Sequence, residues 1–503
     1  MDVGESLENG PIEEQQNAGA RRLRHLFAEA ARHHQAGRLD EAKRLYLEVL
    51  AIDVGHAPSL HGLGLIAQDS GNFDVAVSMM RRAIAADSQD TAYRFSLGAV
   101  LQARGGYDDA LAVFRDVLHL DREHLLARFR VGNVLQLQNR LDEAIAEYQH
   151  ILEMKPDAHD AQFNIANVLR LQGKLTEARV HYERARAMDP GNVDTLWNLG
   201  LLDLLEGNYA AGWPNYEMRH RRPTHGLRAF PEPQWKGEPL QGKRILLHAE
   251  QGLGDTLQFL RYVSRVIAAG GQTILDVPST IQRLATAIPG VAEVVATGET
   301  IPPFDVQCPL MSLPLAFQTS LDSIPGAVPY LSIPEDAKRA AIRRPWPAQG
   351  LRVGLVWGAT PRFFEDSDRS IPLAFFEPVL ATQGAHFFSL QMGPSADQLD
   401  KLQAPLTDLR EAIGDFADTA ALVAHLDLVI TVDTSVAHVA GGLGKPTWVL
   451  LPFSPDWRWL IDREDSPWYP TARLFRQPRP RDWESVMKRV RSELALISQK
   501  ENH

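Results

Sequence analysis

A motif that recurs every 34 residues constrains the first part of this 503-residue chain more than any other feature. The five copies are GRLDEA from Gly37, GNFDVA from Gly71, GGYDDA from Gly105, NRLDEA from Asn139 and GKLTEA from Gly173. A period of this length is typical of helical hairpins, which cannot bury their apolar faces alone and therefore stack on one another. The repeat predicts an all-α stack with a concave groove.

Other positions keep the same register. Small residues stand where the two helices of a hairpin must approach closely, at Ala30, Gly64, Gly98, Gly132 and Ala166. Alanines mark the second helix, at Ala42, Ala76, Ala110, Ala144 and Ala178. Aromatic residues or methionine follow one turn later, at Tyr46, Met80, Phe114, Tyr148 and Tyr182. Pro156 and Pro190 are expected to end helices.

This pattern resembles the tetratricopeptide repeat, and the resemblance implies a superhelix over residues 23–226. GNYAAG from Gly207, followed by Tyr216, is a degenerate sixth copy that we expect to cap the stack. Residues 1–22 are predicted to be a flexible N-terminus. The groove is expected to bind a protein or peptide. A scaffold that only oligomerises is the alternative.

Composition narrows the class of protein. A formal charge of -11, without a run of Lys or Arg, argues against a nucleic-acid partner. The acidic, polar first residues do not fit a signal peptide, and no apolar stretch approaches the roughly 20 residues of a membrane span. Cys308 is the single cysteine, so an internal disulfide is excluded. A cytoplasmic protein is the simplest interpretation.

The second half of the chain alternates strands with helices. Proline and glycine crowd residues 227–242, which we interpret as a linker. Strands are predicted at 244–248, 273–277, 291–296, 351–357, 385–390, 428–432 and 447–451, and helices at 256–269, 279–287 and 482–498. This alternation is typical of parallel sheets covered by helices. We expect two Rossmann-like α/β domains, 243–345 and 346–503, with a cleft between them.

The most informative segment for function is DLVITVDTSVAHVAGGLGKPTWVLL, residues 427–451. A buried strand ends on Asp433-Thr434-Ser435, which are helix-capping residue types, and a short helix over 436–443 follows. Helix N-termini at the carboxyl edge of a parallel sheet suit phosphates. We predict that a nucleotide phosphate binds over Thr434 and Ser435. The sequence GGLGK is not an ATPase loop, because Pro446 follows Lys445 where Ser or Thr is required.

A second segment, HAEQGLGDTLQFLRYV, follows the strand predicted at 244–248. Gly252 and Gly254 allow a tight turn, and Asp255 opens the next helix. The carboxyl edges of the two sheets would face one another and bring Asp255 near a ligand at Thr434. A carboxylate there could accept a proton from an attacking hydroxyl. A purely structural helix cap is the alternative for Asp255.

Together these two segments resemble glycosyltransferase family 9, the heptosyltransferase-like enzymes, over residues 243–480. The resemblance implies a GT-B fold with an N-terminal acceptor domain, a C-terminal nucleotide-sugar domain and inversion without metal or cofactor. It makes Asp255 the general base and Asp433, Thr434 and His438 donor-site residues. Ser435 departs from the family's glycine, which leaves the donor open, and the added repeats leave the acceptor open.

A cation should stabilise the leaving diphosphate, and the family often uses a Lys or Arg from the middle of its C-terminal domain. Arg362 and Arg369 are the candidates, and we favour Arg369. The stretch PFSPDWRWLIDREDSPWYPTARLFRQ could form an aromatic lid over the cleft or a domain-closing core.

The expected function is transfer of a sugar from a nucleotide-sugar to a hydroxyl. The order of repeats and catalytic part is similar to that of the protein O-GlcNAc transferases, so a protein acceptor is expected. The competing hypothesis is a catalytically inactive tetratricopeptide scaffold for protein–protein interaction.

Overall fold

The computed structural model describes residues 10–222, 228–359 and 369–500. The chain divides into two compact units. The first comprises Met1–Gln172 and Thr176–Met188, and the second Gly173–Leu175 and Asp189–His503.

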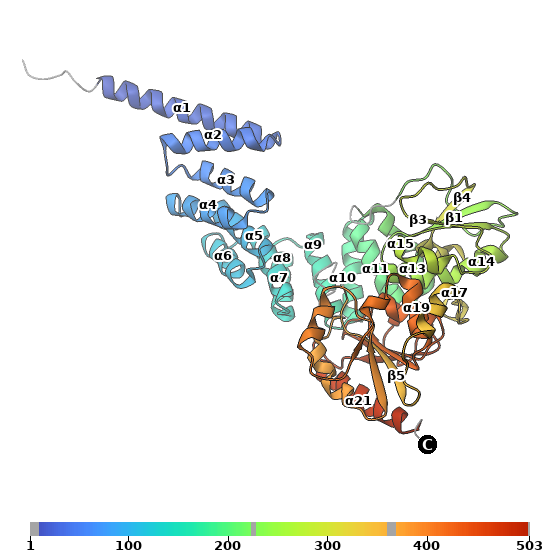
Figure 1. Cartoon of the computed structure of the whole chain (residues 1–503). Coiled ribbons are helices and arrows are strands. Elements are labelled where there is room, and N and C mark those ends of the chain that lie inside the picture. Colours follow the sequence, from blue (N-terminus) through green and yellow to red (C-terminus); the bar gives the residue numbers. More distant parts are fainter. Residues whose placement is uncertain (1–9, 223–227, 360–368, 501–503) are drawn as a thin grey trace, which may run out of the picture. The chain divides into compact units, whose positions relative to one another are not determined.

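The first unit consists of helical hairpins, drawn in blue to teal in Figure 1. Its helices are α1 (Gly10–Gln35), α2 (Leu39–Ile52), α3 (Ala57–Asp69), α4 (Phe73–Ala86), α5 (Thr91–Ala103), α6 (Tyr107–Leu120), α7 (Leu125–Leu137), α8 (Leu141–Met154), α9 (His159–Leu171) and α10 (Leu175–Met188). The all-helical repeat architecture predicted from the 34-residue period is therefore confirmed. Helices α8 and α10 end just before Pro156 and Pro190, as expected.

The repeated small residues have the packing role that the sequence implied. A Cβ atom on Gly132 would lie 2.6 Å from the Tyr148 ring, and one on Gly98 would lie 2.6 Å from the Phe114 ring. These distances are too short for two non-bonded carbons, so in these two hairpins the aromatic ring occupies the space that a methyl group would need. The alanines of the second helix are all fully buried, namely Ala42, Ala76, Ala110, Ala144 and Ala178.

Residues 10–22, which we assigned to a flexible N-terminus, form the beginning of α1. Pro11 stands in the first turn, where its missing N–H costs nothing, and Glu, Gln, Ala and Arg residues of high helix propensity follow it. Residues 1–9 lie outside the described part of the chain.

The second unit begins with one more hairpin, α11 (Val193–Leu205) and α12 (Tyr209–Tyr216), followed by the 3-10 helix η1 (Glu217–Arg221). This is the degenerate sixth copy. Trp213 Nε1 donates a hydrogen bond to the Thr319 carbonyl at 2.8 Å, and Trp468 Nε1 donates one to Tyr209 Oη at 2.9 Å. The sixth hairpin is therefore packed into the α/β unit, a role that its repeat spacing did not reveal.

A four-stranded parallel sheet follows, in the order β3-β2-β1-β4. Its strands are β1 (Arg244–His248), β2 (Gln272–Val277), β3 (Glu293–Ala296) and β4 (Val306–Pro309). The helices in this part of the chain are α13 (Leu253–Phe259), α14 (Val263–Ala268), α15 (Ser279–Ala285), α16 (Leu313–Ala316) and α17 (Glu335–Ile342). The single helix predicted at 256–269 is instead α13 and α14, joined by a 3-10 turn at Leu260–Tyr262.

The second sheet has six parallel strands in the order β10-β9-β8-β5-β6-β7. They are β5 (Leu351–Val356), β6 (Ala385–Ser389), β7 (Thr407–Asp408), β8 (Leu428–Val432), β9 (Thr447–Leu451) and β10 (Ala472–Arg476). Its helices are α18 (Glu377–Leu380), α19 (Phe416–Ala424), α20 (Ser435–Gly442) and α21 (Trp483–Lys500). Two parallel α/β sheets are thus confirmed.

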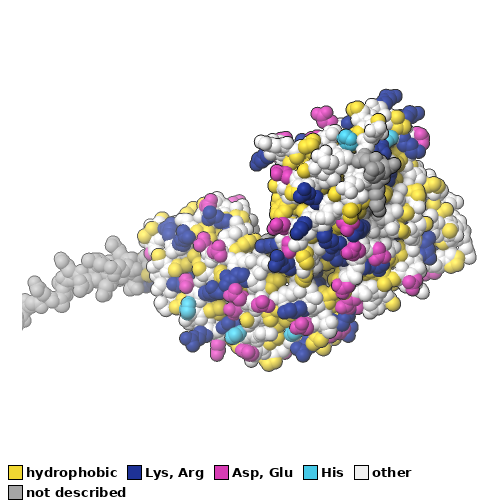
Figure 2. All heavy atoms as spheres, turned by 90° about the horizontal axis from the view of Figure 1, so that it is seen from below, with side chains coloured by type: hydrophobic (Ala, Val, Ile, Leu, Met, Phe, Trp, Pro, Cys, Tyr) yellow, Lys and Arg dark blue, Asp and Glu magenta, His cyan; other side chains and the backbone are white. Residues whose placement is uncertain are grey.

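Two surface observations complete the description. Within the described residues, none of the helices combines the length and apolar character needed to cross a bilayer. On the face drawn in Figure 2, basic and acidic side chains are interspersed rather than gathered by sign.

Candidate functional site

Asp255 lies in the first turn of α13, beyond the carboxyl end of β1. Gly252 is the residue that caps this helix, in extended conformation. One Asp255 oxygen, Oδ2, accepts the Gly252 N–H at 2.7 Å. The carboxylate therefore satisfies one of the donors that a helix start leaves unpaired. Asp255 does have the structural role considered as an alternative, although as the third helical residue rather than as the cap.

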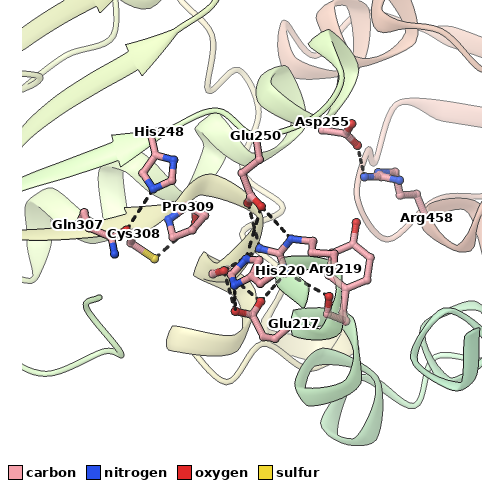
Figure 3. Close-up of polar contacts among 12 residues, drawn as sticks. Glu217, Arg219, His220, His248, Glu250, Asp255, Gln307, Cys308, Pro309 and Arg458 are labelled. Carbon is pink, nitrogen blue, oxygen red and sulfur yellow. Dashed lines mark hydrogen bonds and ion pairs between the residues drawn. The ribbon is translucent and has the colours of Figure 1, made fainter. Parts of the chain in front are cut away.

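The other Asp255 oxygen contacts a residue that the sequence did not single out. Oδ1 accepts a hydrogen bond from Nη2 of Arg458, which comes from the 3-10 helix η10 (Trp457–Trp459). Figure 3 shows the two side chains pointing toward one another. Arg458 is buried, and its Nη1 also donates to Asp456 at 2.9 Å. Both oxygens of the candidate base are thus engaged.

The predicted phosphate site lies at the start of α20. Thr434 precedes the helix in extended conformation, with φ of -139°, and Ser435 is the first helical residue. The Thr434 hydroxyl shares a hydrogen bond of 3.0 Å with the Thr431 hydroxyl. The glycines of GGLGK close α20, and Gly444, with φ of +72°, follows it. Their position agrees with the rejection of an ATPase loop.

His438 is buried within α20. Its Nδ1 shares a hydrogen bond of 2.7 Å with Tyr469 Oη, and its ring stacks on Trp459 at 5.9 Å between centroids. Burial, reinforced by nearby arginines, holds the pKa of His438 well below its ordinary value. The imidazole is therefore neutral at pH 7 and packed inside the protein.

The two segments singled out in the sequence meet at Gly254. A Cβ atom on this glycine would lie 2.8 Å from His438 Cδ2 and 3.7 Å from Ser435 Cα. Only a residue without a side chain allows α13 to come this close to α20. The helix that carries Asp255 is thus packed against the helix that begins at Ser435.

Arg369 also lies at this place. Its Nη1 donates to the Asp433 carbonyl oxygen at 3.2 Å. Asp433 is buried, and burial together with the neighbouring Asp456 raises its pKa, while Arg369 and Arg458 oppose the shift. Arg362, the other candidate cation, lies outside the described residues.

The aromatic stretch after β9 forms a core rather than a lid. Trp459, Trp468 and Tyr469 are at most 1% exposed. The buried Arg261 guanidinium stands over the Trp468 and Tyr469 rings at 5.2 and 4.6 Å, and its Nη1 donates to the Trp468 carbonyl at 2.6 Å. Of the two alternatives left open, the structure supports the domain-closing core.

A second buried charge cluster, missed in the sequence, joins the sixth hairpin to the loop before Asp255 (Figure 3). Arg219 is fully buried, and its Nε and Nη2 donate to the Glu250 carboxylate at 3.0 and 2.9 Å. Nη2 also donates to Ser312 Oγ at 2.7 Å. Although burial alone would raise it, Arg219 and His220 lower the pKa of Glu250 to about 2. The charged Glu250 therefore anchors the loop that leads to Asp255.

Comparison with known proteins assigns the helical part of the chain. The sequence profile of the tetratricopeptide repeat family matches residues 61–124, 100–158, 132–193 and 163–211. This region consists of tetratricopeptide repeats. Among the described residues, we found no group of three or more His, Cys, Asp or Glu side chains placed to hold a metal ion.

The other matches are more distant. Protein FlbA of Caulobacter vibrioides is 28% identical over 315 residues, which are 56% of this chain and 52% of that protein. The chain thus spans about half the length of this relative. Among solved structures, YrrB, described as a TPR protein with an unusual peptide-binding site, is 22% identical over 35% of this chain and 91% of its own, with a TM-score of 0.32. A MamA structure is 24% identical over 34% of this chain and 94% of its own, with a TM-score of 0.31.

Proposed function

We propose that the α/β unit is an inverting glycosyltransferase of the GT-B type and that the tetratricopeptide repeats hold its protein or peptide acceptor. The observation that carries this proposal is the packing of the Asp255 helix against the start of α20, with Gly254 beside Ser435 and His438. This packing supports the proposal, because it brings the helix of the proposed base close to the start of the helix proposed to bind phosphate.

The start of α20 is the part suited to the donor. The N–H groups of a helix's first turn and its dipole favour a diphosphate over Thr434 and Ser435. Arg369, which donates a hydrogen bond to the Asp433 carbonyl, adds a positive charge near the start of α20. Negative charge grows on the diphosphate as the sugar leaves, so these fixed donors stabilise the transition state more than the ground state.

Asp255 is the part suited to the acceptor. In the proposed step, an acceptor oxygen forms a bond to the anomeric carbon, while the bond from that carbon to the diphosphate breaks. The electron pair leaves with the diphosphate, and the acceptor proton passes to the Asp255 carboxylate. The chemistry needs no metal, since helix dipole and arginines neutralise the leaving group.

A specific observation favours a second candidate, an inactive α/β unit carried by a protein-binding scaffold. Gly252 and Arg458 engage both oxygens of Asp255, and His438 is enclosed by Trp459 and Tyr469. A purely structural Asp255 would have the same contacts.

Ligand-dependent thermal unfolding separates the two candidates. Screening the full chain against UDP-, GDP-, ADP- and dTDP-sugars should raise the melting temperature with at least one donor, because a ligand that binds only the native state stabilises it. Ser435→Asp should abolish that rise, since a carboxylate at the helix start repels phosphate while it favours the helix dipole.

The matched control is Ser279→Asp, which places the same charge on the first residue of α15 in the other sheet. This variant should keep the full ligand-induced rise. If no sugar nucleotide stabilises the wild type, or if Ser435→Asp responds as the wild type does, the transferase proposal fails and the scaffold remains.

A further inference from the structure

Arg458 is the charged side chain at this site to which the resemblance gives no role. Its guanidinium is buried and divides its donors among three acceptors: Nη2 contacts Asp255, Nη1 contacts Asp456 at 2.9 Å, and Nε contacts Gln258 Oε1. An arginine presents five N–H donors in a fixed plane and cannot be deprotonated at neutral pH. Arg458 is therefore a permanent buried cation in direct contact with the proposed base.

Its position also places it beside the proposed donor site. The next residue, Trp459, stacks on His438 of α20. The charge of Arg458 acts on both Asp433, which precedes α20, and His438, which lies inside it. The guanidinium is thus in contact with the α13 carboxylate, and the residue that follows it contacts α20.

Two glutamine side chains, Gln258 in contact with this cation and Gln251 earlier in the same segment, point to a ligand that supplies hydrogen-bond acceptors. Gln258 is fully buried, and Gln251 lies in the loop before Gly252. The Nε2 donors of Gln251 and Gln258 are both buried, and the described residues offer no hydrogen-bond acceptor to either. A buried N–H without an acceptor is costly, so native proteins seldom leave one unless something binds there.

We propose that Arg458 is a ligand of the donor's diphosphate and that Asp255 and the diphosphate compete for its Nη2 donor. This inference rests on the proposed function. When a diphosphate oxygen accepts the hydrogen bond from Arg458 Nη2, Asp255 Oδ1 loses that hydrogen bond. The carboxylate is then available for the acceptor hydroxyl. Donor binding therefore prepares the base, and the nucleotide-sugar binds before the acceptor reacts.

Competition makes an unusual prediction for affinity. Asp255→Asn removes the charge that holds Arg458, so the full-length variant should bind UDP, GDP or ADP at least fivefold more tightly than the wild type. Arg458→Gln should weaken the same nucleoside diphosphate at least tenfold, because a charge-assisted contact to phosphate is lost. Titration calorimetry at low and fixed salt measures both changes.

The double variant separates competition from simple repulsion. In the Arg458→Gln background, Asp255→Asn should change affinity less than twofold, because the shared guanidinium is gone. An equal gain in both backgrounds would mean that Asp255 only repels phosphate, and this would overturn the inference while leaving the transferase proposal intact. If the wild type binds none of UDP, GDP, ADP and dTDP, both proposals fail.

Folding of the variants has its own check. Should Arg458→Gln prove unfolded by circular dichroism, Arg458→Lys keeps the charge but can no longer serve two carboxylates and Gln258 from one plane. Asp255→Asn must then improve affinity less in the Lys background than in the wild type, and an unchanged gain would again reject competition.

Discussion

The first unit, which contains the repeat hairpins, is here called the repeat unit, and the second unit, which contains the two sheets, the α/β unit. The two are stabilised by contacts of different kinds. In the repeat unit, one contact recurs within each hairpin, as between Gly98 and Phe114 and between Gly132 and Tyr148. In the α/β unit the decisive contacts each occur once and join distant residues, and Asp255 and Arg458 are 203 positions apart. If one contact is lost in the repeat unit, equivalent contacts remain in the other hairpins. The α/β unit has no equivalent contact to replace a lost one.

The difference in chemistry is as large as the difference in spacing. The repeat contacts are those of close-packed apolar side chains. The α/β unit buries ion pairs, among them Arg219 with Glu250, and removing one partner of a buried pair typically costs about 3–5 kcal/mol. We therefore expect substitutions in the α/β unit to have the larger effects.

The largest expected effect comes from deleting the sixth hairpin. A chain that begins at Asp189 keeps α11, α12 and Arg219 and should unfold cooperatively. A chain that begins at Lys236 exposes Trp468 and leaves Glu250 buried without its arginine. We expect this shorter chain to be insoluble or unfolded, as measured by circular dichroism and gel filtration.

The comparison between these two truncations is its own control, because both lack the first unit. Equal melting temperatures for the two chains would show that the sixth hairpin is dispensable and that the α/β unit begins after it.

The second expected effect concerns catalysis. Asp255→Asn should lower the transfer rate by about 10²–10⁴-fold, because the positioned base is lost. Asparagine keeps an acceptor for the Gly252 N–H, and Arg458 keeps Asp456 as a charged partner, so the melting temperature should fall little. The transfer rate and the melting temperature should be measured on one preparation.

Asp456→Asn offers a comparison on the same guanidinium, since Asp456 contacts Nη1 of Arg458. This variant should keep most of the transfer rate. A folded Asp255→Asn protein with wild-type turnover would exclude the general-base role.

The third prediction compares glycines in the two units. Gly254→Ala forces a carbon to within 2.8 Å of His438 and should destabilise the α/β unit by about 1–3 kcal/mol, with loss of transfer. Gly132→Ala should cost less. Alanine already occupies the equivalent position at Ala30 and Ala166, and alanine in a helix recovers about 1 kcal/mol of propensity.

Urea unfolding of the full chain, followed separately for each transition, measures both changes. If Gly132→Ala proves as costly as Gly254→Ala, the repeats have no greater tolerance than the α/β unit.

The smallest expected effect is on pH dependence. Folding lowers the pKa of His438 from its ordinary value of 6.5, so the unfolded chain binds a proton that the native protein excludes. The contribution of His438 to the free energy of unfolding is therefore fully present above pH 6.5 and decreases as the pH falls below this value. One histidine changes the number of bound protons by at most one, so the free energy of unfolding changes by at most about 1.4 kcal/mol per pH unit.

His438→Gln removes that titrating group. Between pH 6.5 and 5, the free energy of unfolding of this variant should depend less on pH, by the slope that corresponds to at most one proton. The other histidines whose pKa is lowered continue to titrate in this variant and contribute to the remaining slope, namely His56, His61, His181, His248 and His425. Asp433, whose pKa is raised to about 6, opposes them. An unchanged slope in the Gln variant would mean that His438 is protonated in the native protein.

Strand prediction succeeded where buried runs were continuous. The strands β1, β8 and β9 have the predicted bounds, since each is a short apolar run with breakers on both sides. Strands β4, β7 and β10 were missed, and β7 has only two residues. Val306–Pro309 is only four residues long and ends in proline, and arginine at both Arg473 and Arg476 hides the apolar pattern of β10. Short or charged strands have no local signature.

Some residues of the candidate site could be chosen from the sequence and others could not, as with the strands. The sequence singled out Asp255 and the Asp433–Ser435 turn as candidates, because glycines, capping residues and an adjacent strand mark both places locally. Arg458 and Arg219 were not identified, since an arginine gives no sign in the sequence of the distant carboxylate that it will meet.

The sequence by itself determined the repeat hairpins and the alternation of strands and helices, because each depends on periodic contacts between neighbours along the chain. Only the tertiary structure decided that the sixth hairpin packs into the α/β unit, that the tryptophan-rich stretch is core, and that Asp255 is paired with Arg458. These pairings depend on which surfaces meet after the elements have formed. That choice is set by shape and charge over the whole unit, and no local spacing encodes it.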